Sequence, residues 1–197
     1  KYGFIYQPDF YISDATVPYA DCEYDMNFIG NLSDNVDVYN RPSILSYIAQ
    51  FSKVHHLNSF LYLKYSNHMS RLNRYFGIKN KYEKLVEAYC ENDFMHPEAM
   101  SLNEVEKKQQ NAKIIIDLSH ANRQGLTINA ITALAKGKKL ITTNKRIIDE
   151  PFYNPTNIFI LDEKNPHLDA AWLKTPPQPI DMSELRMDNW LKTVLAE

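Results

Sequence analysis

Residues 113–143 read KIIIDLSHANRQGLTINAITALAKGKKLITT and carry the clearest structural signals in the chain. The apolar run at 113–118 predicts a buried strand, which a polar loop follows. Residues 126–136 predict a helix that Gly137 ends at its C′ position, and residues 139–143 predict the next strand. A strand, a helix and a second strand in this order are typical of a parallel βαβ unit.

The same alternation extends to both sides of this unit. The remaining expected strands lie at 24–31, 57–65, 93–96 and 157–162. The remaining expected helices lie at 40–51, 69–75, 82–90, 102–111 and 183–195. The helix at 102–111 is the best signalled, because Ser101 and Glu104 form a capping-box pattern. We therefore expect an α/β fold with a mostly parallel sheet of five or six strands and helices on both of its faces.

The composition narrows the function classes. Among 197 residues, 22 Lys and Arg against 24 Asp and Glu give a net charge of −2, so we expect no nucleic-acid partner. Two cysteines without a CxxC motif indicate neither a disulfide framework nor a metal site. No apolar run approaches the roughly 20 residues of a membrane-spanning helix. We expect a soluble, intracellular protein.

The two ends of the chain differ from its middle. The chain begins with Lys1 rather than methionine, and residues 1–18 are aromatic, polar and interrupted by prolines. This pattern is more typical of a connector than of a first strand or helix. A proline-rich link precedes the last predicted helix. We therefore expect a connector over 1–23, one α/β domain over 24–175, and the link with the C-terminal helix over 176–197.

Ligands of open parallel sheets bind outside the carboxyl ends of the strands, and the loop at 119–127 is the most informative one there. Its glycine lets the backbone approach a ligand, and free N–H groups at the start of a helix favour an anion such as a diphosphate. The candidate binding residues in this loop are His120, Arg123, Gln124, Gly125, Leu126 and Thr127. The alternative is that Gly125 and Thr127 only shape the turn from strand to helix.

A second candidate loop follows the predicted strand at 139–143. Thr143, Asn144 and Lys145 supply a hydroxyl, an amide and a cation, which suit hydrogen bonds to a ribose or sugar and attraction of a phosphate. A simple turn with a solvated basic end explains the same residues equally well.

A third candidate loop follows the predicted strand at 24–31. Gly30, Asn31 and Ser33 suit a close approach to a phosphate, although an ordinary loop contains the same residue types. Arg41 either reaches the same crevice or lies exposed at the start of a helix. No catalytic residue is identified, since no Ser-His-Asp, Cys-His or paired-carboxylate arrangement stands out.

Residues 114–144 resemble the donor-binding core of bacterial glycosyltransferases of the two-domain GT-B type, which assemble lipopolysaccharide or capsule. The motifs that carry the resemblance are QGLT at 124–127, KKLITTN at 138–144, YDMNFIG at 24–30, FYNP at 152–155 and NIFILD at 157–162. The resemblance implies that residues 24–175 form a Rossmann-like three-layer domain that binds a nucleotide-sugar. It also implies that the connector and the last helix adjoin a separate N-terminal half, which would bind the acceptor.

The resemblance also implies partners and a location. The donor substrate is a nucleotide-sugar, with a UDP-sugar favoured, the acceptor is a glycan or glycolipid, and no cofactor or metal takes part. The expected location is the cytoplasm, with peripheral attachment to the inner membrane left open.

One position departs from the family pattern. Thr132 stands where the family has a glutamate that holds the donor ribose, and a neutral, shorter side chain cannot make the same charge-assisted bonds. The alternative to a transferase is therefore a degenerate, non-catalytic Rossmann-like module that serves protein association.

Overall fold

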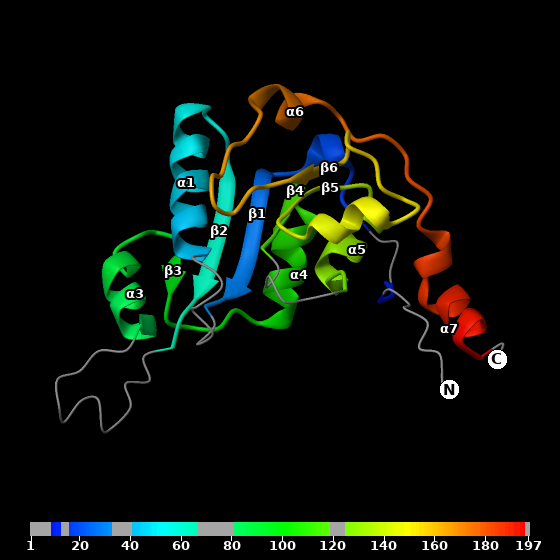
Figure 1. The fold of residues 1–197 in the computed structure, drawn as a ribbon, viewed down its shortest axis with the longest axis horizontal. Helices are drawn as coiled ribbons and strands as arrows, with labels where there is room; N and C mark the ends of the chain where they lie inside the picture. The colour runs from blue at the N-terminus through cyan, green and yellow to red at the C-terminus, as the bar shows by residue number, and fades with distance from the viewer. Residues whose placement is uncertain (1–8, 13–15, 33–40, 67–80, 119–124, 196–197) are drawn as a thin grey trace.

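The computed structural model describes residues 9–12, 16–32, 41–66, 81–118 and 125–195 (Figure 1). Within these residues, six strands form one parallel sheet in the order β3-β2-β1-β4-β5-β6. The strands are β1 (Tyr24–Asn31), β2 (Ser59–Lys64), β3 (Met95–His96), β4 (Ala112–Asp117), β5 (Lys139–Thr142) and β6 (Ile158–Ile160). The expected Rossmann-like α/β fold is confirmed, since this strand order is the doubly wound one.

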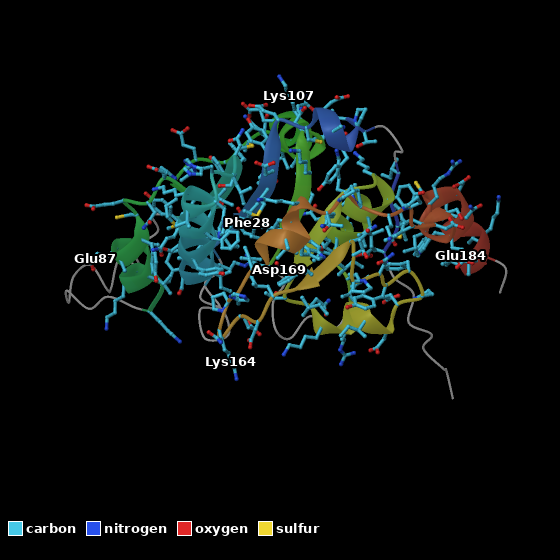
Figure 2. All side chains as sticks on the ribbon, turned by 90° about the horizontal axis from the view of Figure 1, so that it is seen from above. Phe28, Glu87, Lys107, Lys164, Asp169 and Glu184 are labelled. Atoms are coloured by element: carbon cyan, nitrogen blue, oxygen red, sulfur yellow. The ribbon has the colours of Figure 1, made fainter. Side chains whose placement is uncertain are left out.

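Helices cover both faces of the sheet and make the other two layers. They are α1 (Arg41–Val54), α3 (Lys81–Tyr89), α4 (Leu102–Gln110), α5 (Ile128–Ala135), α6 (Ala170–Lys174) and α7 (Met187–Leu195). Short 3₁₀ turns are η1 (Tyr19–Asp21), η2 (Lys145–Asp149) and η3 (Ser183–Leu185). Figure 2 shows Lys107 of α4 and Asp169, just before α6, on opposite sides of the sheet.

Two buried clusters show which helices share a face. Side chains of α1, α3 and α6 pack with Met26 of β1 and Ile114 of β4. On the other face, Ala133 of α5 packs with Ile115 of β4. Burial of such side chains removes apolar surface from water and is the main driving force for this layered arrangement.

The local signals behave as their chemistry predicts. The Ser101 side chain accepts a hydrogen bond from the N–H of Glu104, and the Glu104 side chain accepts one from the N–H of Ser101, so the capping box is present. Gly137 has a φ of +67° and its N–H donates to the carbonyl of Leu134, as expected for a glycine that ends a helix. The predicted helix at 69–75 lies outside the described residues.

The C-terminal prediction needs one correction. Residues 183–195 do not form one continuous helix, because the 3₁₀ turn η3 precedes α7 and Arg186 between them has an extended backbone. Tyr11 pairs with Arg186 in a parallel bridge, and its N–H donates to the carbonyl of Leu185 at 3.0 Å. This extended stretch is thus held by pairing with residues near the other end of the chain.

Segments from the two ends of the chain pack against each other. The rings of Phe10 and Trp190 lie 4.9 Å apart, and Tyr11 is buried together with Met182 and Leu185. Residues of the predicted connector therefore contribute to the core beside α5. No helix in the described part of the chain has the length and apolar character to cross a membrane.

Candidate functional site

The topological switch point of the sheet lies between β1 and β4. From β1 the chain winds outward to β2 and β3, and from β4 it winds the other way to β5 and β6. A crevice is expected between the carboxyl ends of two such strands. A pocket of about 400 Å³ lies there, lined by the ends of β1 and β4, the first turn of α5, and Arg41.

Arg41 joins the ends of the two strands. Its guanidinium donates one hydrogen bond to the carbonyl of Asn31, at the end of β1, and another of 2.8 Å to the carbonyl of Leu118, just after β4. Arg41 begins α1, so the helix start brings a positive charge into the pocket wall. Of the two readings of Arg41, the structure supports the one in which it reaches the crevice.

Asp117 supplies a buried carboxylate to the same pocket. Its Oδ1 accepts a 3.0 Å hydrogen bond from the hydroxyl of Thr127, and its Oδ2 accepts one of 3.4 Å from the hydroxyl of Thr142. Thr127 in turn accepts a bond from the N–H of Ala130 and caps α5. A negative charge near the start of a helix is electrostatically favourable. Sequence reasoning missed Asp117 as a site residue; the signal was a charged residue at the end of an apolar strand.

The pocket presents groups of both signs. The positive charge comes from Arg41, and the first-turn N–H groups of α5 have no carbonyl partner within the helix. The negative charge comes from Asp117, which is 8% exposed. An anion is attracted by the first set of groups and a hydroxyl donates to the carboxylate. A ligand that combines phosphates with sugar hydroxyls therefore suits this wall.

Gly30 and Asn31, at the end of β1, line the pocket. A Cβ at Gly30 would lie 2.8 Å from Cζ of Phe28. The ring of Phe28 thus occupies the space that any side chain at position 30 would need. Any larger residue at position 30 would have to displace this ring, so packing within β1 favours glycine here.

The predicted residues after β5 support the loops rather than line the pocket. The Asn144 side chain caps η2 by accepting from Arg146 and donates to the carbonyl of Gly125 at 3.1 Å. The N–H of Thr143 donates to the carbonyl of Asp117 at 3.3 Å. Lys145 is exposed. These bonds connect the ends of β4 and β5 to the loop before α5.

Two further predicted residues lie away from the pocket, and four cannot be placed. Leu126 is buried in the core beside α5. Thr132 lines a separate small hollow between α4 and α5, which shares only Asn129 with the larger pocket. Ser33, His120, Arg123 and Gln124 lie outside the described residues.

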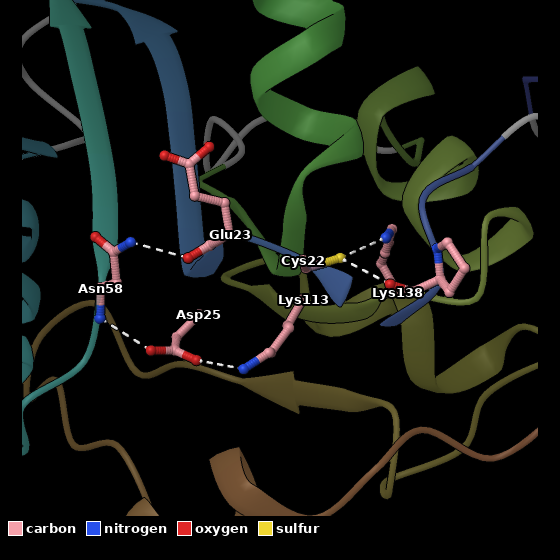
Figure 3. A network of polar contacts seen from close by, with 7 residues as sticks. Cys22, Glu23, Asp25, Asn58, Lys113 and Lys138 are labelled. Carbon is pink, nitrogen blue, oxygen red and sulfur yellow. Dashed lines mark hydrogen bonds and ion pairs between the residues drawn. The ribbon is translucent and has the colours of Figure 1, made fainter. Parts of the chain in front are cut away.

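A second hollow, of about 410 Å³, lies at the amino ends of β1 and β4. Asp25 there forms an ion pair of 2.8 Å with Lys113 and accepts a 2.9 Å bond from the N–H of Asn58 (Figure 3). Burial and the charge of Asp25 raise the pKa of Tyr19 to about 12. The charges of Asp25 and Lys113 are therefore matched to each other and need no ligand.

Nowhere in the described residues do three His, Cys, Asp or Glu side chains gather as metal ligands would.

No model of a known protein family matches the chain, and a sequence search of curated proteins finds no match. The functional conclusion therefore depends on the fold, the switch-point pocket and the motifs quoted above.

Proposed function

We propose that this chain binds a nucleotide-sugar in the switch-point pocket and is the donor-binding half of a glycosyltransferase. The observation that carries the proposal is the position of Arg41, Asp117 and the start of α5 around one pocket at the carboxyl edge of the sheet. The motif resemblance adds the class of acceptor, a lipopolysaccharide or capsule glycan, which a separate half of the enzyme would bind.

The positive and negative groups of the pocket would bind different parts of the ligand. The diphosphate lies toward Arg41 and the first-turn N–H groups of α5, which stabilise the negative charge that develops on the leaving diphosphate. The ribose or sugar hydroxyls donate to Asp117, which Thr127 and Thr142 hold in place. The pocket volume of about 400 Å³ is within the usual range for small-molecule sites.

Titration calorimetry with UDP-, GDP-, ADP- and CMP-sugars tests this proposal directly. We expect saturable binding of at least one of them to the folded chain. Asp117→Asn keeps the size of the side chain and removes its charge, so it should weaken the binding of the nucleotide-sugar. Arg146→Ala, at an exposed position in η2, is the matched control. A folded chain that binds none of the four classes contradicts the proposal.

A non-catalytic module is the second candidate, and Thr132 is the observation that favours it. Thr132 supplies no carboxylate, and it lies in the hollow next to the pocket rather than in it. Thr132→Glu separates the two candidates. Donor binding that appears only in this variant favours a degenerate module, whereas binding already present in the original chain and unchanged in the variant favours a working site of different design.

A further inference from the structure

Cys22 and Lys138 are in contact although they lie far apart in the sequence. Nζ of Lys138 is 2.9 Å from Sγ of Cys22 (Figure 3). Cys22 lies between η1 and β1, and Lys138 lies between α5 and β5. The exposed fractions of the two residues are 8% and 2%. The contact thus joins two separate connections inside the protein.

The side-chain partner of the buried Lys138 ammonium group is the sulfur of Cys22. Nζ of Lys138 also donates to the carbonyl of Val17 at 2.7 Å, and Sγ of Cys22 donates to the carbonyl of Pro18 at 3.4 Å. Within the described residues, no carboxylate lies within ion-pair distance of Lys138. A buried ammonium without a carboxylate is unusual, because charges inside proteins are normally paired.

A small hollow lies on the Lys138 side of this pair. The hollow between α4 and α5 has Lys138 and Gln110 in its wall and a volume of about 30 Å³. The carbonyl of Gln110 is itself 3.8 Å from Sγ of Cys22. A space of this size holds one water molecule, and hydrogen peroxide is only slightly larger.

We propose that hydrogen peroxide converts this contact into a covalent sulfur–nitrogen bond between Cys22 and Lys138. In the first step the thiol attacks one peroxide oxygen, the O–O bond breaks, and a sulfenic acid and one water form. In the second step the Lys138 ammonium first loses a proton to solvent, and the resulting amine attacks the sulfur; the S–O bond breaks, and the hydroxyl leaves as water with a second proton from nitrogen. The balance is one thiol, one amine and one peroxide giving one sulfenamide and two waters.

The bond would fix α5 to the segment that enters β1. Lys138 follows the end of α5, whose first turn lines the switch-point pocket. A thiol reductant reverses the bond, as it does for other sulfenamides. The inference does not require the proposed nucleotide-sugar function.

The test uses the Cys90→Ser variant, because Cys90 is an exposed free thiol and a Cys22–Cys90 disulfide would have the same mass change. The folded variant is treated with hydrogen peroxide, alkylated and digested. We expect a linked pair of peptides that contain Cys22 and Lys138, about 2 Da lighter than the sum of the two, as loss of two hydrogens requires. Dithiothreitol should release both peptides.

Three results would overturn the inference. They are Cys22 found only as a sulfenic, sulfinic or sulfonic acid, Cys22 found unmodified while methionines are oxidised, and a linked pair that retains an oxygen atom. Lys138→Arg in the same background keeps the positive charge but removes the nucleophilic amine, so it should show the sulfenic acid without the linked pair. The chain itself, with both cysteines, provides the remaining comparison: the Cys22–Lys138 pair should also be found there.

Discussion

The hydroxyl of Thr127 donates a 3.0 Å hydrogen bond to Oδ1 of Asp117. The same hydroxyl oxygen accepts from the N–H of Ala130, so one side chain connects the end of β4 to the first turn of α5. The negative charge of Asp117 therefore stabilises the positive end of the helix through Thr127. This relationship makes the wall of the switch-point pocket part of the folded framework.

Replacing Thr127 by valine tests this connection. Valine has nearly the shape of threonine but neither caps α5 nor donates to Asp117, and we expect a loss of about 1 to 2 kcal/mol in the free energy of unfolding. Thr127→Ser keeps the hydroxyl and should lose less. Urea denaturation followed by circular dichroism measures both variants. Equal stability of the valine and serine variants would contradict a role for the hydroxyl.

Arg41 offers a test of the pocket itself. Its guanidinium spans the carbonyls of Asn31 and Leu118, and a lysine has one nitrogen where arginine has three. We expect Arg41→Lys to weaken the nucleotide-sugar found in the calorimetric screen by roughly tenfold, which corresponds to about 1.4 kcal/mol. Thermal unfolding of the same sample gives the stability change, so a loss of binding in a fully folded variant can be distinguished from unfolding.

The fold was predictable because its signals are local. The apolar run of β4, the Ser101–Glu104 capping box and the helix-ending Gly137 each lie within a few residues of the structure that they specify. Strand order has no such signal. It follows from the connections, which wind in opposite directions on the two sides of β1 and β4.

The site was less predictable because its contacts are distant in sequence. Arg41 reaches the carbonyl of Leu118 only because β1 and β4 are neighbours in the sheet. Asp117 meets Thr142 because these two residues are partners in the register of β4 and β5. Thr132 was placed by resemblance to a motif, and the geometry of α5 turns it toward α4 instead. Local chemistry identifies candidate groups, but strand pairing decides which of them meet.

Gly137 allows a simple test of backbone strain. Its φ of +67° is a conformation that L side chains rarely adopt, while a Cβ there would meet no atom within 4 Å. Strain of the backbone, and not crowding, should thus determine the effect of Gly137→Ala. We expect a loss of about 1 kcal/mol, and a smaller one for Gly137→Asn, because asparagine tolerates this region better. Urea midpoints of the two variants check the ranking, which an equal or reversed order would refute.

Lys139 makes the stability depend on pH. Its side chain is fully buried. Its Nζ donates to the carbonyls of Trp172 and Thr175, and it lies 3.6 Å from the centre of the Trp172 ring. Burial lowers the pKa of Lys139 to about 8, although the charge of Asp169 opposes the shift.

The direction of the effect follows from proton binding. Between about pH 8 and the ordinary lysine pKa of 10.5, the unfolded chain holds a proton at Lys139 that the folded chain has released. The folded state therefore becomes more stable as the pH rises through this range. Tyr19 acts in the opposite direction, because its pKa is raised to about 12, but it does so only above its ordinary value of 10.0. The range from pH 7 to 10 thus isolates the lysine.

The matched variant is Lys139→Met, which has a similar length and no charge. We expect the free energy of unfolding of the original chain, measured relative to this variant, to rise by up to about 3 kcal/mol from pH 7 to pH 10. Urea denaturation at intervals of half a pH unit measures the difference. A difference that stays constant over this range would mean that Lys139 keeps its proton in the folded protein, held by the two carbonyls and the Trp172 ring, and would contradict the lowered pKa.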